Sequence, residues 1–232
     1  RGWRRMAGLA LVSSLTTAGP ACSSGPTGED DAGEPDPLAE QLRVPDGFEI
    51  GLFADGLAGV RTLELGPDGR LYAALSNAGR VVRFEVGSDG PVGEPETVAD
   101  GLNRPYGLAF RDGDLYVGET HRVIRLDGPG FGSPEVVVPD LPTGGHWTRE
   151  IVFGPDDMLY LSIGSSCNLC EESDPRRAAV VRYRPDGSGE EVVARGVRNS
   201  AGLAFHPETG ELWMSQNERD HLGDDLPPEE IN

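Results

Sequence analysis

An internal fourfold repeat constrains the fold of this chain more than any other feature. Four segments share one pattern: an apolar strand, a turn that carries Gly with Asp or Glu, and a second strand with an aromatic residue near its start. They begin at Leu63, Leu108, Ile151 and Leu203. A turn of this kind between two apolar runs favours a hairpin, because glycine adopts positive φ without steric cost. Each segment therefore predicts a β-hairpin, at a period of roughly 40–50 residues.

The first three repeats continue in parallel beyond the hairpin. "GRVVRFEVG", "HRVIRLDG" and "AAVVRYRPDG" predict third strands, and "PETVADGL", "PEVVVPDLP" and "EEVVARGV" predict fourth strands. Four short strands per repeat indicate an all-β fold of the β-propeller class. A two-sheet sandwich is the alternative, but it gives no reason for the same four-strand pattern to recur. The fourth repeat stops after its second strand, so the sequence predicts about three and a half blades. An unclosed ring leaves sheet edges exposed, which favours a fragment of a larger propeller.

The N-terminal residues have a different composition. Residues 1–22 run from basic through mildly apolar to small residues, which is typical of a secretory signal peptide. Cys22 follows Ala21 as in a bacterial lipoprotein cleavage site, and it is a candidate lipid anchor. Residues 23–43 are acidic and rich in Pro and Gly, and they predict a disordered linker. The folded domain is therefore expected over 44–232, in an exported protein of the periplasm or cell surface.

Charge limits the partners of the chain. The formal net charge is −19, and the sequence contains no lysine. Such an acidic chain repels phosphate backbones, so nucleic acid is not expected as a partner.

Chemistry is expected where the loops that precede the first strand of each blade converge. We call them the first-strand loops; they read "GLAGVRT", "GLNRPYG", "PTGGHWTRE" and "GVRNSAG". Their arginine, histidine and asparagine side chains predict a site for an anionic, planar or hydroxylated ligand beside a candidate general base, His146. The alternatives stay open at this point: His146 as an ordinary exposed loop residue, and Arg198 and Asn199 as residues that cap a turn.

Two further motifs have several readings. Cys167 and Cys170 form a C-x-x-C pair, which suits half a zinc site, a redox pair or a disulfide. In an exported protein the default is a local disulfide. The C-terminal stretch "QNERDHLGDDLPPEEIN" is dense in carboxylates, which suits Ca²⁺ or simply a solvated acidic loop.

The stretch from "GGHWTREIVFGPDDMLYLSIGSSCNLCEESDP" to "ARGVRNSAGLAFHPETGELWMSQNERDHLGDD" resembles the glucose/sorbosone dehydrogenase family. The resemblance runs from about Val44 to Asn232. It implies an exported six-bladed β-propeller that uses pyrroloquinoline quinone (PQQ) and calcium. It also implies oxidation of a sugar, or of a sugar-derived aldehyde or alcohol, with electrons passed to an external acceptor.

The resemblance also implies roles for particular residues. His146 matches the family's base, which takes the proton of the substrate hydroxyl as hydride passes to the quinone. Arg198 and Asn199 match a pair that contacts the quinone, with Arg198 stabilising negative charge on its oxygens. A third group matches residues that bind the cofactor and calcium: Gln216, Asn217, Glu218, Glu229 and Glu230.

Three positions depart from the sugar-oxidising members. Ser165 stands where those members place an Asp that orients the histidine, and Gly145 and Leu102 replace an Asp and a Gln near the sugar and cofactor. These departures leave the substrate open. Two other classes also remain: a metal-dependent lactonase on a related propeller, and a non-catalytic propeller that binds ligands at the cell surface.

Overall fold

The computed structural model describes residues 42–48, 50–88, 90–223 and 228–232. The signal peptide, Cys22 and most of the 23–43 linker lie outside these residues. The chain divides into two compact units, Arg1–Gly51 and Leu52–Asn232, and we call the second the propeller unit. Within the part of the chain that is described, no helix is long and apolar enough to cross a membrane.

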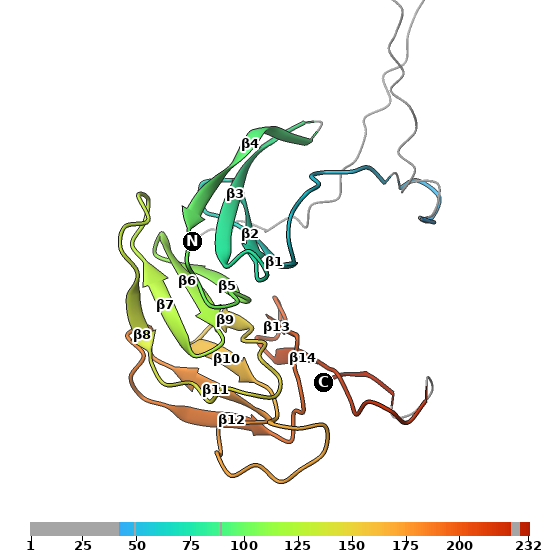
Figure 1. Cartoon of the computed structure of the whole chain (residues 1–232), viewed down its shortest axis with the longest axis vertical. Helices are drawn as coiled ribbons and strands as arrows, with labels where there is room; N and C mark the ends of the chain where they lie inside the picture. The colour runs from blue at the N-terminus through green and yellow to red at the C-terminus, as the bar shows by residue number, and fades with distance from the viewer. Residues whose placement is uncertain (1–41, 49, 89, 224–227) are drawn as a thin grey trace, which may run out of the picture. The chain divides into compact units, whose positions relative to one another are not determined.

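The propeller unit consists of four antiparallel sheets, each a meander of strands consecutive in sequence (Figure 1). The first contains β1 (Val60–Leu65), β2 (Leu71–Leu75), β3 (Arg80–Gly87) and β4 (Gly90–Ala99). The second contains β5 (Leu108–Arg111), β6 (Asp114–Glu119), β7 (Arg122–Leu126) and β8 (Glu135–Val138). The third contains β9 (Ile151–Phe153), β10 (Leu159–Ile163), β11 (Ala179–Tyr183) and β12 (Glu191–Arg195). The fourth contains β13 (Gly202–Phe205), β14 (Leu212–Gln216) and β15 (Glu230–Ile231). The four-strand pattern predicted from the repeats is thereby confirmed.

The first strands of successive sheets contact one another: β1 lies against β5, β5 against β9, and β9 against β13. In Figure 1 these strands lie on the inner side of the sheets, and β4, β8 and β12 lie on the outer side. This is the blade arrangement of a β-propeller. It brings the first-strand loops to one end of the unit.

The repeated aromatic residue explains how one sheet packs on the next. Edge-to-face contacts join the second-strand tyrosine of each complete sheet to the first-strand phenylalanine of the following sheet. The pairs and their ring-centroid distances are Tyr72–Phe110 at 4.8 Å, Tyr116–Phe153 at 4.9 Å and Tyr160–Phe205 at 4.9 Å. Buried aliphatic clusters surround these contacts between the first and second sheets and between the second and third. The repeat in sequence is therefore a repeat of the blade-to-blade contact.

Turn chemistry follows the same repeat. In the first hairpin Gly69 takes the left-handed conformation, with φ of 79°. The third hairpin replaces this glycine with Asp157, which takes the same conformation with φ of 65°. Asp tolerates positive φ better than most residues, so the turn survives the substitution.

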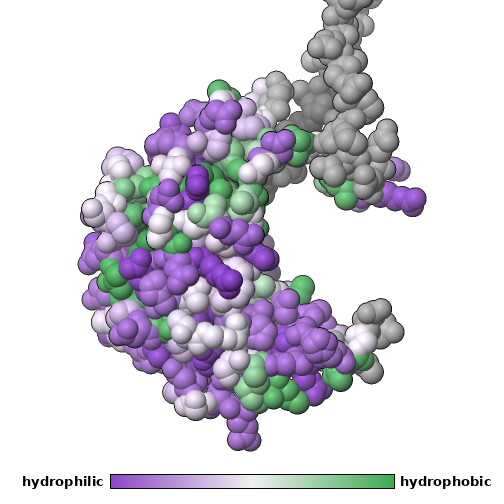
Figure 2. Space-filling model, in the orientation of Figure 1, coloured by the Kyte–Doolittle hydropathy of each residue, from purple (hydrophilic) through white to green (hydrophobic). Residues whose placement is uncertain are grey.

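The fourth sheet corrects the expectation that its repeat stops after two strands. Glu230 and Ile231 pair antiparallel with Gln216 and Ser215, so a short third strand forms inside the acidic segment. Two residues without an apolar alternation give no strand signal in the sequence, and only the pairing partner reveals this strand. The face of the molecule shown in Figure 2 is mostly hydrophilic, in keeping with the net charge of −19.

Candidate active site

Backbone hydrogen bonds join the first-strand loops to one another and to the loops that follow β10 and β14. The N–H of Gly107 donates to the carbonyl of Arg149 at 3.0 Å, and the N–H of Ser165 donates to the carbonyl of Arg198 at 2.8 Å. The N–H of Asn217 donates to the carbonyl of Asn199 at 2.9 Å. The predicted convergence of these loops is therefore a feature of the fold, and it places His146 beside residues that lie far from it in sequence.

Ser165 holds His146 at the Nδ1 edge of its imidazole ring. Its Nδ1 lies 3.0 Å from the carbonyl oxygen of Ser165 and 2.9 Å from Oγ of the same residue. A carbonyl oxygen only accepts hydrogen bonds, so Nδ1 carries the proton. The Ser165 hydroxyl donates to the carbonyl of Cys167 at 2.6 Å, which leaves its lone pairs toward Nδ1. Nε2 is therefore the nitrogen with a free lone pair, as a general base requires.

Glycines create the space in which His146 lies. Gly144 and Gly145 have φ of 84° and 64°, in the left-handed region that favours glycine. A Cβ atom on Gly164 would lie 2.5 Å from Cβ of His146 and 2.9 Å from Oδ1 of Asn199. The side chains of His146 and Asn199 thus share the space above Gly164, directly after β10.

Asn199 is buried, with 8% of its surface exposed. Its Oδ1 accepts a hydrogen bond from the Thr148 hydroxyl at 2.7 Å. This bond fixes the orientation of the amide, and no residue in the described ranges accepts from Nδ2. Nδ2 is therefore an amide donor that remains available to a ligand oxygen. Asn199 is therefore more than a turn cap.

Two buried arginines support the loop that carries His146. Arg149 is fully buried and donates to the carbonyls of Pro142, His146 and Thr148. Arg177 is also buried and donates to the carbonyls of Thr143, Gly144 and Gly164. Burial, and then the neighbouring charge of Arg177, lower the pKa of Arg149 to about 10. Arg149 thus stays charged at neutral pH, and its charge strengthens the hydrogen bonds that hold the loop.

Arg198 lies at the same site but is largely committed to protein partners. Its Nε donates to the carbonyl of Asn168, and its two terminal nitrogens donate to the carbonyl of Asn217, Oδ1 of Asn168 and a carboxylate oxygen of Asp220. The Asp220 contact is an ion pair at 2.7 Å. One N–H of Arg198 remains for a ligand. Its predicted role toward a quinone stays a prediction, and its observed role is to join the loop after β10 to the loop after β14.

The predicted calcium residues do not gather around one point. The Asn217 carbonyl accepts from Arg198, Glu218 accepts from the side chain of Gln216, and Glu229 accepts from the N–H of Glu218 at 3.1 Å. Glu230 belongs to β15 and pairs with Gln216. A calcium ion needs six to eight oxygen ligands, so in this arrangement the described residues do not fit it. We derive no step through calcium at this position.

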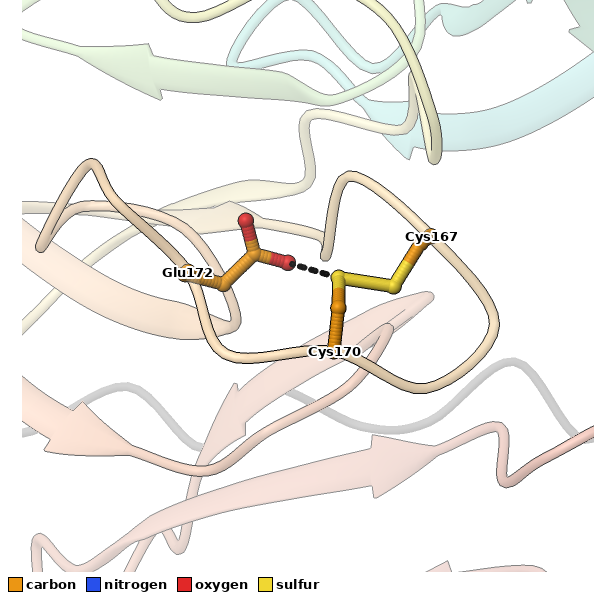
Figure 3. Close-up of side chains that lie close together, drawn as sticks. All are labelled: Cys167, Cys170 and Glu172. Carbon is orange, nitrogen blue, oxygen red and sulfur yellow. Dashed lines mark hydrogen bonds between the residues drawn. A yellow bond between two sulfur atoms is a disulfide. The ribbon is translucent and has the colours of Figure 1, made fainter.

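Cys167 and Cys170 are joined in a disulfide (Figure 3). Together with Glu172 they form a cluster whose sulfur and carboxylate atoms lie close enough to hold a metal ion. Neither sulfur is a free thiolate, so the group does not offer the ligand set of a zinc site. The 3.6 Å approach of Cys170 Sγ to Glu172 is a contact rather than a hydrogen bond, because a disulfide sulfur carries no hydrogen.

Sequence reasoning missed Arg149, Arg177 and Trp147 as members of the site. Arg149 and Arg177 border predicted strands, where an arginine usually faces solvent. The pattern "GGHWTRE" pointed to the loop but not to the burial of its arginine. Arg149 donates to loop carbonyls and packs against Gly118 of β6, which only the tertiary structure brings beside it.

The fold and this site define a β-propeller with a polar site where its first-strand loops meet. The TrAA12-like family model matches residues 42–227, and the chain belongs to this family. A curated relative, an uncharacterized protein of Borreliella burgdorferi, is 28% identical over 213 residues, which are 84% of this chain and 54% of the relative. The chain thus spans about half the length of the relative that it matches.

Solved structures share the fold. The PQQ domain of a pyranose dehydrogenase from Coprinopsis cinerea has a TM-score of 0.68 at 18% identity, over 77% of this chain and 48% of that chain. A Trichoderma reesei carbohydrate-active enzyme of family AA12 has a TM-score of 0.68 at 24% identity, over 81% and 54%. The PQQ-bound aldose sugar dehydrogenase of Streptomyces coelicolor has a TM-score of 0.60 at 24% identity, over 78% and 61%. The comparisons therefore show a TrAA12-like protein with the fold of PQQ-containing sugar dehydrogenases. They do not distinguish the glucose/sorbosone type that the sequence resembles.

Proposed function

We propose that this chain carries the catalytic base of a PQQ-dependent dehydrogenase that oxidises a sugar, or a sugar-derived aldehyde or alcohol. The observation that carries the proposal is the orientation of His146, whose Nδ1 is protonated against two oxygens of Ser165 and whose Nε2 is left as the acceptor. The fold shared with PQQ-containing sugar dehydrogenases supports the choice of reaction. An external electron acceptor and an exported location remain part of the proposal.

The residues present fit an anionic, planar cofactor. Nδ2 of Asn199 and the remaining N–H of Arg198 are the available donors, and Gly164 leaves room for the side chains of His146 and Asn199 to lie together. When bound, PQQ supplies the acceptor for the hydride of the substrate carbon. Calcium is included in the assay below because a calcium structure of a family AA12 enzyme shares the fold, although the described residues do not form its ligand set.

The part played by this chain follows from its own geometry. Nε2 of His146 takes the proton of the substrate hydroxyl, and the imidazolium that forms keeps its Nδ1–H bond to the Ser165 carbonyl. Asn199 donates from Nδ2 to a ligand oxygen, and Thr148 prevents its amide from turning. Arg149 and Arg177 hold the loop in place, so the base does not have to be ordered at each turnover.

The proposal is tested by His146→Gln in the protein expressed from the complete reading frame. Dye reduction is followed with PQQ and Ca²⁺ over aldoses, sugar aldehydes and polyols. We expect kcat to fall by roughly 10²- to 10⁴-fold, the usual contribution of a general base. His206→Asn is the matched control, because His206 accepts the N–H groups of Glu208 and Thr209 in the β13–β14 turn, and Asn can accept them too.

An unchanged kcat in His146→Gln would show that the base lies elsewhere. Acid release without an electron acceptor would favour the lactonase alternative, and no activity with any cofactor would favour the binding propeller. No observation among the described residues favours either alternative, so we do not develop them.

A further inference from the structure

Two arginines from separate first-strand loops lie on the indole of Trp147. The guanidinium carbon of Arg104 is 5.1 Å from the indole centroid, and that of Arg61 is 5.5 Å from it. Tyr106 packs edge-to-face on the same indole at 5.7 Å. Trp147 follows His146 directly in sequence, so this cluster borders the proposed base.

Neither guanidinium has an anionic partner in the ranges that the structure describes. Arg61 and Arg104 take part in none of the ion pairs found there, although Arg70, Arg83 and Arg182 each pair with a carboxylate. Both side chains are exposed. In a chain with a net charge of −19, two cations left together on one aromatic ring produce a local positive field that favours a bound anion.

The carboxyl of Glu150, which also acts on Tyr106, does not cancel this field. Burial raises the pKa of Glu150 to about 8; the hydrogen bond from Thr62 lowers it and Glu64 raises it. Glu150 acts electrostatically on Tyr106, as does Arg61. At neutral pH Glu150 is mostly protonated, so the charge beside Trp147 remains positive.

Arg104 is held in its place by the fold. Its φ is 50°, a left-handed conformation that costs energy for a residue other than glycine. The preceding N–H, of Asn103, donates to the fully buried Glu119 at 2.6 Å, and the carbonyl of Asn103 accepts from Thr120. The backbone directly before Arg104 is therefore held to the end of β6.

We propose that Arg61 and Arg104, whose guanidinium groups lie over the indole of Trp147, bind a carboxylate of a ring-shaped ligand next to the base His146. Guanidinium groups match carboxylate geometry. The carboxylate belongs either to the quinone cofactor or to an acidic sugar substrate such as a uronate. This inference deepens the proposed function by naming the ligand class, and its binding test does not depend on turnover.

The experiment measures binding to the protein from the complete reading frame by calorimetry and tryptophan fluorescence. The probes are PQQ, glucuronate, glucose as the uncharged sugar, and benzene-1,3,5-tricarboxylate as a planar anion without a quinone. We expect Arg61→Gln with Arg104→Gln to raise the Kd of the carboxylate probes at least 10-fold and to leave glucose unchanged. Arg70→Gln is the control, because Arg70 already pairs with Glu85 in the first sheet.

The outcomes separate the two sources. Loss of affinity for PQQ and the tricarboxylate alone assigns the site to the cofactor, and loss for glucuronate alone assigns it to the substrate. Unchanged affinities in the folded double variant, or no binding of any carboxylate probe by the unaltered protein, overturn the proposal. Trp147→Phe is a second variant for the case in which the double variant does not fold. It keeps an aromatic ring at this position and is expected to bind the carboxylate probes more weakly.

Failure of the carboxylate site can be distinguished from failure of the proposed function. If His146→Gln binds carboxylates normally and kcat is unchanged, the base assignment fails and the carboxylate site stands. If His146→Gln abolishes turnover while the arginine double variant binds the carboxylate probes as before, the base assignment stands and the carboxylate site fails.

Discussion

Ser165 reaches Nδ1 of His146 with both its carbonyl oxygen and its hydroxyl, and the two oxygens can be separated by mutation. The carbonyl is present in any residue at this position. Removal of the hydroxyl therefore weakens the preference for the Nδ1–H tautomer but does not reverse it. An Asp at this position would instead supply a charge, so we expect the present histidine to be a weaker base than one paired with a carboxylate.

Ser165→Ala is expected to reduce the ratio of the Nδ1–H to the Nε2–H tautomer of His146 by about 3- to 10-fold, the worth of one neutral hydrogen bond. The ratio is measured from the ¹⁵N shifts of the ring nitrogens, assigned with His146→Gln. Ser166→Ala is the control, because the hydroxyl of Ser166 lies 3.4 Å from the sulfur of Cys170 rather than on the histidine. An Nε2–H tautomer in the unaltered protein would contradict the orientation described.

At the scale of elements, the loop between β10 and β11 connects the base to the fourth sheet. Ser165 donates to the carbonyl of Cys167, and Asn168 accepts from Arg198. The Cys167–Cys170 disulfide closes the turn that contains both of these acceptors. The loop therefore positions Ser165 and Arg198 together, although it carries no ligand-binding group of its own in this arrangement.

Replacement of Cys167 and Cys170 by Ala is expected to lower the free energy of unfolding by about 2 kcal/mol, because a loop this short restricts the unfolded chain little. For a domain of this size the loss corresponds to roughly 4–8 °C in Tm. Thermal unfolding by circular dichroism measures it. A reducing agent should lower the Tm of the unaltered protein to that of the variant and leave the variant unchanged; a further drop in the variant would place the effect elsewhere.

At the scale of the whole propeller unit, Glu150 connects sheets that are not neighbours. Its Oε2 accepts from the Thr62 hydroxyl of β1 at 3.3 Å, across a sequence separation of 88 residues. Its carboxyl is partly buried beside β1, and this burial raises its pKa from 4.5 to about 8. The folded state therefore binds this proton more tightly than the unfolded state does.

The sign of the pH dependence follows from this shift. The contribution of the protonated Glu150 is complete below pH 4.5 and is lost as pH rises to about 8, at a rate of at most about 1.4 kcal/mol per pH unit. Glu150→Gln keeps the shape without the charge, so its free energy of unfolding should be flatter between pH 5 and pH 9. Chemical denaturation at each pH measures the slope, with the exposed Glu85→Gln as control. Equal slopes in Glu150→Gln and the unaltered protein would contradict a buried neutral carboxyl.

The same scale shows how the repeat ends within this chain. Trp213 occupies the aromatic position of the fourth sheet and is 48% exposed, whereas Tyr72, Tyr116 and Tyr160 are buried against the next sheet. Leu65 occupies the phenylalanine position of the first sheet and is 58% exposed. Trp213 and Leu65 thus hold the two positions that form the blade-to-blade contact elsewhere in the unit, and both are exposed.

The sequence by itself determined the strand pattern, because alternation and turn residues act between neighbours along the chain. The four hairpins, the propeller class and the loop of His146 are all local signals of this kind. The third strand of the fourth sheet escaped prediction because Glu230 and Ile231 become a strand only through pairing with β14.

Tertiary structure alone decided how the site is supported. The aromatic position was visible in each repeat, but its phenylalanine partner lies in the next sheet. Likewise Arg149 packs against Gly118 of the second sheet, and Arg177 donates to carbonyls of the loop that carries His146. The grouping of Arg61 and Arg104 on Trp147 requires three loops to meet. Local propensity specifies backbone conformation over a few residues, whereas burial and charge depend on neighbours that the packing of successive sheets supplies.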